Sequence, residues 1–329
     1  MTKPAVARRP VVSVVVCTYT RARWAGCAAA VDSVLGQLRE GDECLLVTDH
    51  NEPLRWHARQ WFTDCAAVQV VSNGQAPGLS GARNTGVAHS HGEIVAFLDD
   101  DAVATPTWLE ECLAPFTEPE VLAVGAAALP CWPAGRRPGW FPPEFDWVVG
   151  CTHRGLPDRR AAVRNVIGAA MAFRREAFAV AGTFDVSVGR VGTVPVGCEE
   201  TELCIRIRQA KPTAQIIYQP GAVVHHRITP ERTRIGYFVR RCFGEGRSKA
   251  RVARLVGPGD GLSSERDYLR RVLPRAVLRE LSAAARGHGA GLGAATLIAA
   301  GVTAAGLGFL REAAVPRPSV PSWAGAERA

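Results

Sequence analysis

The sequence predicts an α/β fold with a doubly wound sheet, because strand and helix patterns alternate along residues 11–98. Continuous β-branched and apolar runs, typical of strands covered on both faces, stand at 11–17, 43–48, 68–71 and 94–98. Two stretches with apolar residues at helical spacing, 24–38 and 54–65, separate the first three runs. Such sheets bind ligands at the carboxyl ends of their strands, where Thr18, Asp49 and the triplet Asp99 to Asp101 stand.

The second half of the sequence predicts further strands at 165–173 and 215–224 and a helix at 199–209. Residues 132–155 are rich in Pro, Gly and Trp, which indicates a long structured excursion. We therefore predict a main domain over 1–250, with halves of about 10–102 and 103–250, and a helical extension over 251–329.

The extension contains a basic helix pattern around 268–286 and an uncharged stretch at 289–310. Twenty-two uncharged residues would just span a bilayer core, although the many Gly and Ala residues make the stretch weakly hydrophobic. Three alternatives stay open at this point. The stretch spans a membrane, lies on its surface, or packs on the protein as one arm of a helical hairpin.

Composition narrows the functional class. Ten cysteines without a Cys-x-x-Cys pair indicate reduced buried thiols, and the N-terminus lacks the cleavage site of a secretory signal, so we expect the catalytic part in the cytoplasm. Residues 227–286 contain fifteen Lys or Arg against six acids, which accounts for the whole net charge of +8. This distribution argues against a general nucleic-acid surface and for one basic segment that faces an anionic membrane.

The segment FLDDDA is the sharpest chemical feature. Asp99, Asp100 and Asp101 end a buried strand, and three adjacent carboxylates repel one another unless something positive lies among them. A hard divalent cation, Mn²⁺ or Mg²⁺, with the phosphates of a nucleotide diphosphate, would satisfy them. A solvated acidic loop is the alternative.

Directly upstream, GLSGARNTG combines glycines that permit close backbone approach with two donors, Arg83 and Asn84, suited to phosphate or ribose. Downstream, VVHHRI places His225 and His226 at a strand end, where a neutral imidazole could complete a metal site begun by carboxylates. A packed or solvent-facing histidine is the simpler interpretation.

The segment GCEETELC contains three glutamates, Glu199, Glu200 and Glu202, at the start of the predicted helix. Acidic residues are common at helix N-termini because the helix dipole stabilises them. A glutamate held ionised near a cleft can also remove the proton of an attacking hydroxyl.

In order and spacing, these motifs resemble the family-2 inverting glycosyltransferases of the GT-A fold. The resemblance covers about residues 10–250 and rests on VVVCTYTR, LLVTDHN, GLSGARNTG, FLDDDA, NVIGAAMAFRREAF, EETEL and a later histidine. It implies a mixed sheet flanked by helices. WFPPEFDWVVGCTHRG and GCEETELC further resemble an archaeal and actinobacterial branch that includes glucuronosyltransferases acting on glucosyl-dolichyl phosphate.

The resemblance also implies roles for individual residues. Glu200 would be the catalytic base, although the family commonly has Asp there, and Glu199 or Glu202 could take the role. Metal ligands would be Asp101, Asp99 and His225, which is favoured over His226 because Val-x-His is the usual spacing. The implied donor-binding residues are Thr18, Tyr19, Arg21, Asp49, Arg83, Asn84, Asp99 and Asp100. Those on the acceptor side are Gly168, Glu199 and Trp140.

The function that follows is metal-dependent, inverting transfer of a sugar from a nucleotide diphosphate, by resemblance a uridine nucleotide, to a lipid-linked or glycan acceptor. A sugar-phosphate nucleotidyltransferase would need a glycine-rich loop after the first strand, and CTYTRARWAG is glycine-poor there. A non-catalytic membrane adaptor would not need three aspartates on a strand end. If the chain attaches to the inner face of the membrane, a polyprenyl-phosphate acceptor would meet Arg240, Arg241 and Arg247.

Overall fold

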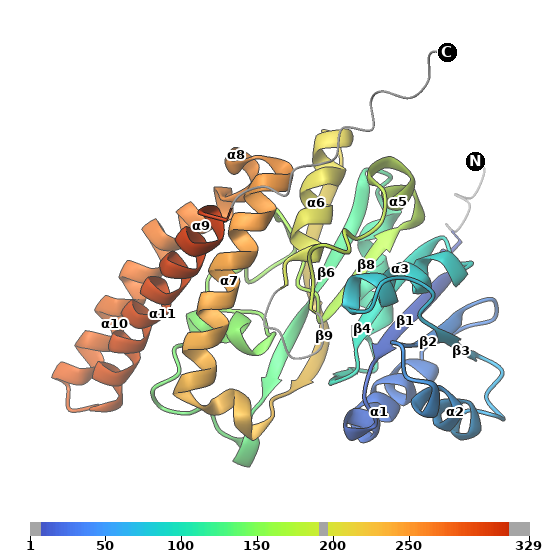
Figure 1. Cartoon of the computed structure of the whole chain (residues 1–329), viewed down its shortest axis with the longest axis horizontal. Coiled ribbons are helices and arrows are strands. Elements are labelled where there is room, and N and C mark those ends of the chain that lie inside the picture. The colour runs from blue at the N-terminus through green and yellow to red at the C-terminus, as the bar shows by residue number, and fades with distance from the viewer. Residues whose placement is uncertain (1–7, 191–196, 316–329) are drawn as a thin grey trace, which may run out of the picture.

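The computed structural model describes residues 8–190 and 197–315, and one mixed sheet of nine strands runs through this part of the chain (Figure 1). The strand order is β3-β2-β1-β4-β8-β6-β9-β5, with β7 paired to β9. The strands are β1 (Val12–Thr18), β2 (Glu43–Thr48), β3 (Val68–Ser72), β4 (Ile94–Asp99), β5 (Ala102–Ala104), β6 (Val121–Cys131), β7 (Ala161–Ala162), β8 (Ala170–Arg174) and β9 (Gln215–Arg227).

The first four strands are parallel, whereas β8 runs antiparallel to both β4 and β6. The predicted mixed doubly wound sheet is therefore confirmed. In the register of the sheet, Thr18 pairs with Thr48 and Cys17 with Asp99. These pairings bring the carboxyl ends of β1, β2 and β4 to one edge, which is where the predicted polar residues stand.

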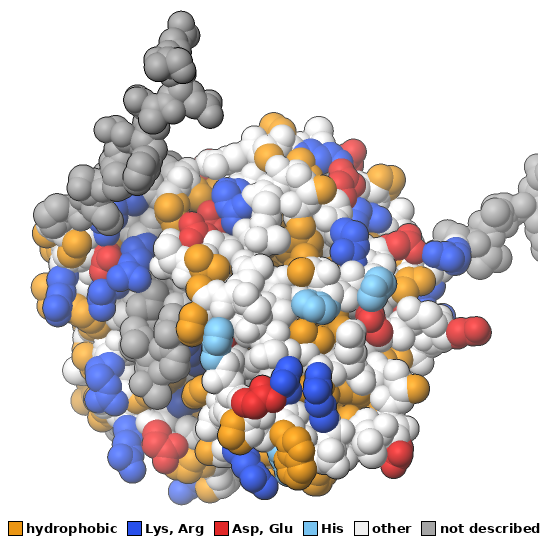
Figure 2. All heavy atoms as spheres, turned by 45° about the vertical axis from the view of Figure 1, so that its right-hand side comes forward, with side chains coloured by type: hydrophobic (Ala, Val, Ile, Leu, Met, Phe, Trp, Pro, Cys, Tyr) orange, Lys and Arg blue, Asp and Glu red, His pale blue; other side chains and the backbone are white. Residues whose placement is uncertain are grey.

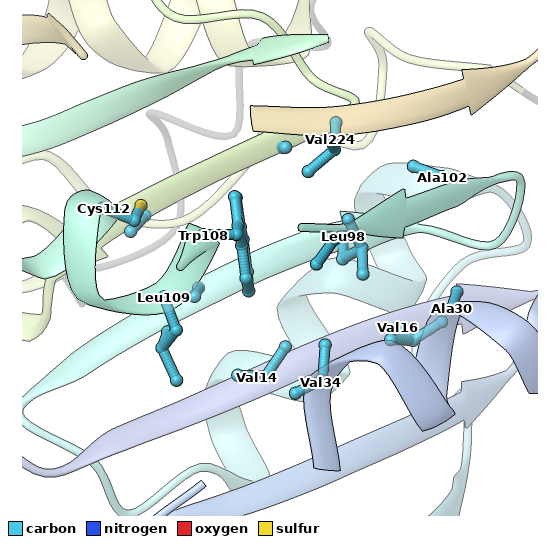
Figure 3. Close-up of a cluster of buried hydrophobic side chains, with 14 of the residues drawn as sticks. Val14, Val16, Ala30, Val34, Leu98, Ala102, Trp108, Leu109, Cys112 and Val224 are labelled. Atoms are coloured by element: carbon cyan, nitrogen blue, oxygen red, sulfur yellow. The ribbon is translucent and has the colours of Figure 1, made fainter. Parts of the chain in front are cut away.

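Helices cover both faces of the sheet. On one face lie α1 (Trp24–Leu35), α2 (Glu52–Trp61) and α4 (Trp108–Leu113), and on the other lie α3 (Leu79–His89), α5 (Arg175–Ala181) and α6 (Glu199–Ala210). Figure 3 shows Val14 and Leu98 of the sheet meeting Val34 of α1 and Trp108 of α4. These side chains are almost fully buried. Such close packing gives rigid support to the edge of the sheet where β1, β2 and β4 end, which is called the site edge below.

The glycine-rich segment 78–86 forms most of helix α3. A Cβ on Gly86 would lie 2.4 Å from Val15 Cγ1, and one on Gly81 would lie 2.0 Å from the Ala76 carbonyl oxygen. Packing of the helix against β1 and its own entry turn thus requires both glycines. The expectation that they make room for a ligand backbone contact is not supported.

The sequence prediction missed two long elements: strand β6, and helix α7 (Ile235–Val256), which runs across the predicted boundary at residue 250. Further helical segments follow: α8 (Pro258–Gly261), α9 (Ser263–Asp267), a π-helical turn (Tyr268–Val272), α10 (Leu273–Ala285) and α11 (Ala290–Ala313). The last part of the predicted extension, 316–329, lies outside the described residues.

Helix α11 folds back beside α10 and packs along α7 (Figure 1). Helices α7 and α11 touch through their backbones. A Cβ on Gly246 of α7 would lie 1.8 Å from the Ala305 carbonyl oxygen, and one on Gly308 of α11 would lie 2.0 Å from the Phe243 carbonyl oxygen. Buried Glu312 fixes the far end of the contact through ion pairs with Arg247 and Arg251. The hairpin alternative is thus the observed arrangement.

The aromatic excursion and the C-terminal helices share one apolar core. It contains Phe141 and Phe145 of the excursion, Phe238 of α7, Leu273 of α10 and Ile298 of α11. The C-terminal helices are therefore integral to the folded body and not an independent appendage.

Among the described helices, α11 is the one whose length and apolar composition would suit a membrane span. One third of its most apolar window, 33%, is buried against protein. Leu292, Leu307 and Leu310 face outward and are 59%, 57% and 65% exposed. On the face nearer β1 to β3, basic and acidic side chains are both spread over the surface (Figure 2).

Candidate active site

A cavity of about 1040 Å³ opens over the site edge of the sheet and extends to the C-terminal helices. Most predicted site residues line it: Thr18, Tyr19, Asp49, Arg83, Asp99, Asp100, Asp101, Gly168, Glu199 and Glu200. The parallel register of β1, β2 and β4 explains why the first of these converge. Its volume is at the upper limit of typical small-molecule sites, so it has room for more than one ligand.

Asp99, Asp101 and His226 form the cluster that could hold a metal. One ligand atom from each lies within 4.8 Å of the other two. His226 Nε2 is 3.0 Å from Asp101 Oδ1, and its Nδ1 is buried without a hydrogen-bond partner among the described residues. Two carboxylate oxygens with an imidazole nitrogen suit a divalent ion such as Mn²⁺, so the residues present fit the predicted metal.

The choice of His225 over His226 is not supported by this geometry. His225 is exposed on β9, whereas His226 is 2% exposed and packs its ring against Gly150. Successive side chains of a strand point to opposite faces, so only one of two adjacent histidines can reach the aspartates.

Two arginines that the sequence analysis did not select stand beside the carboxylates. Arg23 forms ion pairs with Asp100 and Asp101, and Arg232 Nη2 lies 3.1 Å from Asp101 Oδ2. Burial raises the pKa of Asp101, but His226, Arg23 and Arg232 together bring it well below its usual range. Asp101 is therefore an ionised carboxylate surrounded by positive charge.

Asp100 has a different environment although it is the next residue. Its Oδ2 accepts a hydrogen bond from Thr18 Oγ1 at 2.9 Å. Burial, with added repulsion from Asp101, raises the pKa of Asp100 to about 7 against the opposing effect of Arg23. Two adjacent members of the triplet thus differ: Asp101 is ionised, whereas Asp100 holds its proton more strongly.

Arg83 lies almost completely buried between the aspartates and the glutamates. It donates to Glu199 Oε1 at 2.7 Å, to Asp99 Oδ1 at 3.1 Å and to the Gly168 carbonyl at 2.8 Å. Both terminal nitrogens are therefore engaged within the protein. Arg83 links α3, β4 and α6 and sets the spacing between the two acidic groups.

Of the three clustered glutamates, Glu200 has the environment of a proton acceptor that faces the cavity. Its Oε2 is 3.7 Å from the position that a Cβ on Gly168 would take. Burial, with added repulsion from Glu199, raises the pKa of Glu200 to about 8. Glu199 is held by Arg83, and Glu202 is buried in an ion pair with Arg206.

Asp49 lines the cavity at the end of β2. Its Oδ1 accepts from Asn73 Nδ2 at 2.7 Å and its Oδ2 from the backbone N–H of Gly78 at 2.9 Å. Tyr19, 37% exposed, also lines the cavity. By resemblance both residues would hold the nucleotide, and this role stays a prediction.

Besides His225, three predicted site residues lie elsewhere. Arg21 is exposed and does not line the cavity, where Arg23 stands instead. Asn84 is buried and bonds to both backbone groups of Phe184, so it fixes a loop. Trp140 packs on Phe141 and Phe238 of the C-terminal core.

Past Glu200 the cavity wall becomes a network of partly buried charges that the sequence motifs did not indicate as part of the site. Arg241 pairs with Glu245, Lys249 pairs with Glu245 and Glu265, and Arg164 pairs with Glu265. Trp147 of the excursion lies under Arg241, with the guanidinium 5.9 Å from the ring centroid. Helical i, i+4 spacing of 241, 245 and 249 was the signal in the sequence that could have found this network.

The family model "Glycosyl transferase family 2" matches residues 13–181, the segment that contains the aspartates and Arg83. A glucosyl-dolichyl phosphate glucuronosyltransferase of Haloferax volcanii is 38% identical over 248 residues, which are 75% of this chain and 78% of that protein. The chain belongs to glycosyl transferase family 2. A pre-mycofactocin glycosyltransferase of Mycobacterium tuberculosis is 30% identical over 187 residues, which are 56% of this chain and 37% of that protein.

Two solved structures show that this family 2 chain has the GT-A fold. A mannosyltransferase of Pyrobaculum calidifontis in complex with GDP-Man and Mn²⁺ has a TM-score of 0.61 at 20% identity and covers 92% of this chain and 88% of its own. GalNAc-T7 with UDP, GalNAc and Mn²⁺ has a TM-score of 0.54 at 16% identity and covers 80% and 58%. The chain is thus a glycosyltransferase with a mixed GT-A sheet that is followed by C-terminal helices.

Proposed function

We propose that this glycosyltransferase moves a sugar from a nucleotide diphosphate, a uridine nucleotide by resemblance, to a lipid-linked acceptor, with inversion at the sugar carbon. The observation that carries the proposal is the geometry of one cavity, which holds both the acidic metal cluster and Glu200, and in which Arg83 joins Asp99 of the cluster to Glu199, the neighbour of Glu200. The glucuronosyltransferase of Haloferax volcanii, whose name includes a dolichyl phosphate acceptor, supports this substrate class.

Asp99, Asp101 and His226 would hold the divalent ion, Mn²⁺ or Mg²⁺. When bound, such an ion supplies positive charge that stabilises a departing diphosphate. Thr18, Tyr19 and Asp49 line the cavity and would form its donor side, where Asp49 would orient the base.

Glu200 would accept the proton of the attacking hydroxyl. It lies at the N-terminus of α6 beside Gly168, where the absence of a side chain leaves space for the acceptor sugar. Arg83 holds Oε1 of the neighbouring Glu199, whereas Glu200 forms no ion pair with the described residues, which favours Glu200 as the base. Since its pKa is raised, Glu200 is a stronger base than an ordinary carboxylate.

The test is release of nucleoside diphosphate from a panel of sugar nucleotides with Mn²⁺ or Mg²⁺, with and without a polyprenyl-phosphate-linked sugar. We expect metal-dependent release that the acceptor stimulates, and its loss in Asp101→Asn. Release of pyrophosphate from a nucleoside triphosphate and a sugar phosphate would instead identify a nucleotidyltransferase. Binding to liposomes without any turnover would leave the adaptor as the function.

For the location of the enzyme we propose the cytoplasmic face of the membrane. The outward-facing leucines of α11 and the arginines of the cavity rim would make the contact. Because α11 is packed along α7, this proposal is peripheral attachment by the helical hairpin and not a span.

A further inference from the structure

The cavity continues beyond the catalytic groups into an arm between α11 and the π-helical turn. One wall of this arm consists of Val302, Ala305, Gly306 and Phe309 of α11, and the opposite wall of Tyr268, Leu269, Val272 and Leu273. These residues are apolar apart from the Tyr268 hydroxyl, which donates to the Glu144 carbonyl at 2.6 Å. The arm therefore presents two apolar walls with few hydrogen-bonding groups, which suits an apolar ligand.

Charges are arranged at the two ends of this arm. Its inner end meets Lys249 and Arg164, which pair with Glu245 and Glu265, and its outer rim carries the exposed side chains of Arg266, Arg271 and Arg275. Arg271 has one distant acidic neighbour, Asp267, at 3.8 Å. An anionic group on an otherwise apolar molecule would be attracted to this part of the cavity.

Gly306 and Gly293 are the two glycines of α11 that packing does not require, since a Cβ on Gly293 would lie 3.6 Å from Trp140 Cβ. Of these two it is Gly306 that lines the cavity. A Cβ on Gly308 or Gly291 would collide with a neighbouring backbone, and one on Gly301 with Phe145. A Cβ on Gly306 would meet nothing within 4 Å, yet glycine in a helix interior costs about 1 kcal/mol relative to alanine. The position borders the arm, so a ligand in the arm would account for the missing side chain.

We propose that this arm holds the isoprenoid chain of a polyprenyl-phosphate acceptor, with the phosphate among the cations of the cavity wall. The inference rests on the proposed function and adds the place and chemistry of the lipid. It commits to a prenyl chain because the arm opens directly from the cavity that contains Glu200, so its occupant is part of the molecule that receives the sugar.

The experiment measures binding of two probes, dimethylallyl phosphate and farnesyl phosphate, and of inorganic phosphate, without any sugar donor. We expect farnesyl phosphate to bind at least about tenfold more tightly than dimethylallyl phosphate, because each buried methylene adds to affinity. Gly306→Trp fills the arm and should abolish this tenfold difference. Thr303→Trp, at an exposed position of the same helix that does not line the cavity, should keep it.

Binding of UDP with Mn²⁺ is measured on every variant and should be unchanged, which separates blockage of the arm from misfolding. Leu269→Trp, on the opposite wall, gives the same readout if Gly306→Trp does not fold. Equal affinity of the wild type for both prenyl phosphates, or a chain-length preference that survives both blocking variants, would overturn the inference. If the wild type does not bind the nucleotide with metal, the proposed function is contradicted instead. The comparison of the two prenyl phosphates still tests the arm, because it uses no nucleotide.

Discussion

His226 Nε2 lies 3.0 Å from Asp101 Oδ1, and this contact joins the end of β9 to the loop that follows β4. Asp101 also meets Arg23 and Arg232, so four segments of the chain converge on one carboxylate. A buried carboxylate such as Asp101 needs positive partners to offset its charge. A bound cation would take over this role from Arg23 and Arg232.

The first prediction separates the two adjacent histidines. His226→Ala should weaken Mn²⁺ binding in the presence of nucleoside diphosphate by at least about tenfold, because it removes a proposed ligand. His225→Ala is the matched control and should bind Mn²⁺ like the wild type, since that side chain is exposed. Calorimetric titration measures both, and equal weakening by the two variants would contradict the assignment.

The sequence alone could not have chosen between these histidines. Gln219 and Val223 of β9 pair with the consecutive residues Ala126 and Ala127 of β6, so an irregularity interrupts the strand between them. A bulge changes which face the following side chains take, and a shift of one residue reverses every one of them. The spacing of Val and His within the motif contains no information about this interruption.

Site residues whose position depends on one segment could be predicted from the sequence. Those that reach the site only because distant segments pack together could not. Asp49 and Asp99 follow directly from the ends of buried strands, and Glu200 from the start of a helix. Arg23 belongs to the site because it stands at the start of α1, and Arg241 because α7 folds over the cavity. The i, i+4 spacing of 241 and 245 indicates an ion pair but not that the pair faces the site. Asn84 shows the opposite error, since its motif was detected but its amide bonds to Phe184.

The second prediction concerns the proton acceptor. Glu200→Gln should lower sugar transfer by a factor on the order of 10² to 10⁴, because it removes a general base. Binding of the nucleotide with metal should stay within about twofold of the wild type, since Glu200 is not part of the metal cluster. Steady-state transfer assays and nucleotide titrations measure the two effects. Near-normal transfer would place the base at Glu199 or elsewhere.

A third prediction follows from the raised pKa of Glu200, which burial and Glu199 bring to about 8. Because the base works in its ionised form, kcat/KM for the acceptor should rise with pH and level off above about pH 8. Glu199→Gln removes the neighbouring negative charge and should move the rise to lower pH. A pH profile that is flat between about 6 and 9 would show that Glu200 titrates elsewhere or does not act.

The fourth prediction uses two glycines of the same helix. Gly308→Ala should destabilise the protein by about 1–3 kcal/mol, because its Cβ would overlap the carbonyl of Phe243 and force α11 away from α7. Gly306→Ala should leave stability unchanged or raise it by up to about 1 kcal/mol, because its Cβ meets nothing. Urea denaturation measures both free energies of unfolding. Similar values for the two variants would mean that the helices are not in backbone contact.

The contact between α7 and α11 also explains why the sequence of 289–310 does not decide between a membrane anchor and a packed helix. Gly and Ala residues lowered the hydrophobicity of 289–310 below that of a typical span, and Gly308 with Gly246 is needed for helix packing. Small residues serve the same purpose in membrane and soluble helix pairs, so composition does not separate them. Removing α11 by truncation would uncover α7, and a test of membrane attachment must keep the hairpin intact.

The fifth prediction is that the full chain floats with anionic liposomes at low salt. Leu307 and Leu310 are 57% and 65% exposed on α11, and each basic group of the nearby rim adds about 1 kcal/mol at an anionic surface. Leu307→Ser with Leu310→Ser should therefore reduce flotation several-fold. Two exposed tryptophans on α2, Trp56 and Trp61, lie at the opposite end of the molecule from α11 (Figure 1) and provide the matched control as a Ser double variant.

Flotation of this tryptophan control should equal that of the wild type, and added salt should weaken the binding of both because the arginines of the rim are screened. Apolar contact and charge are each marginal alone, and stable attachment needs the two together. If the tryptophan variant loses flotation and the leucine variant keeps it, the donor half of the molecule faces the membrane. If the wild type itself stays in the unbound fraction at low salt, peripheral attachment is wrong, and a water-soluble acceptor becomes the better substrate for the cavity over β1 and β4.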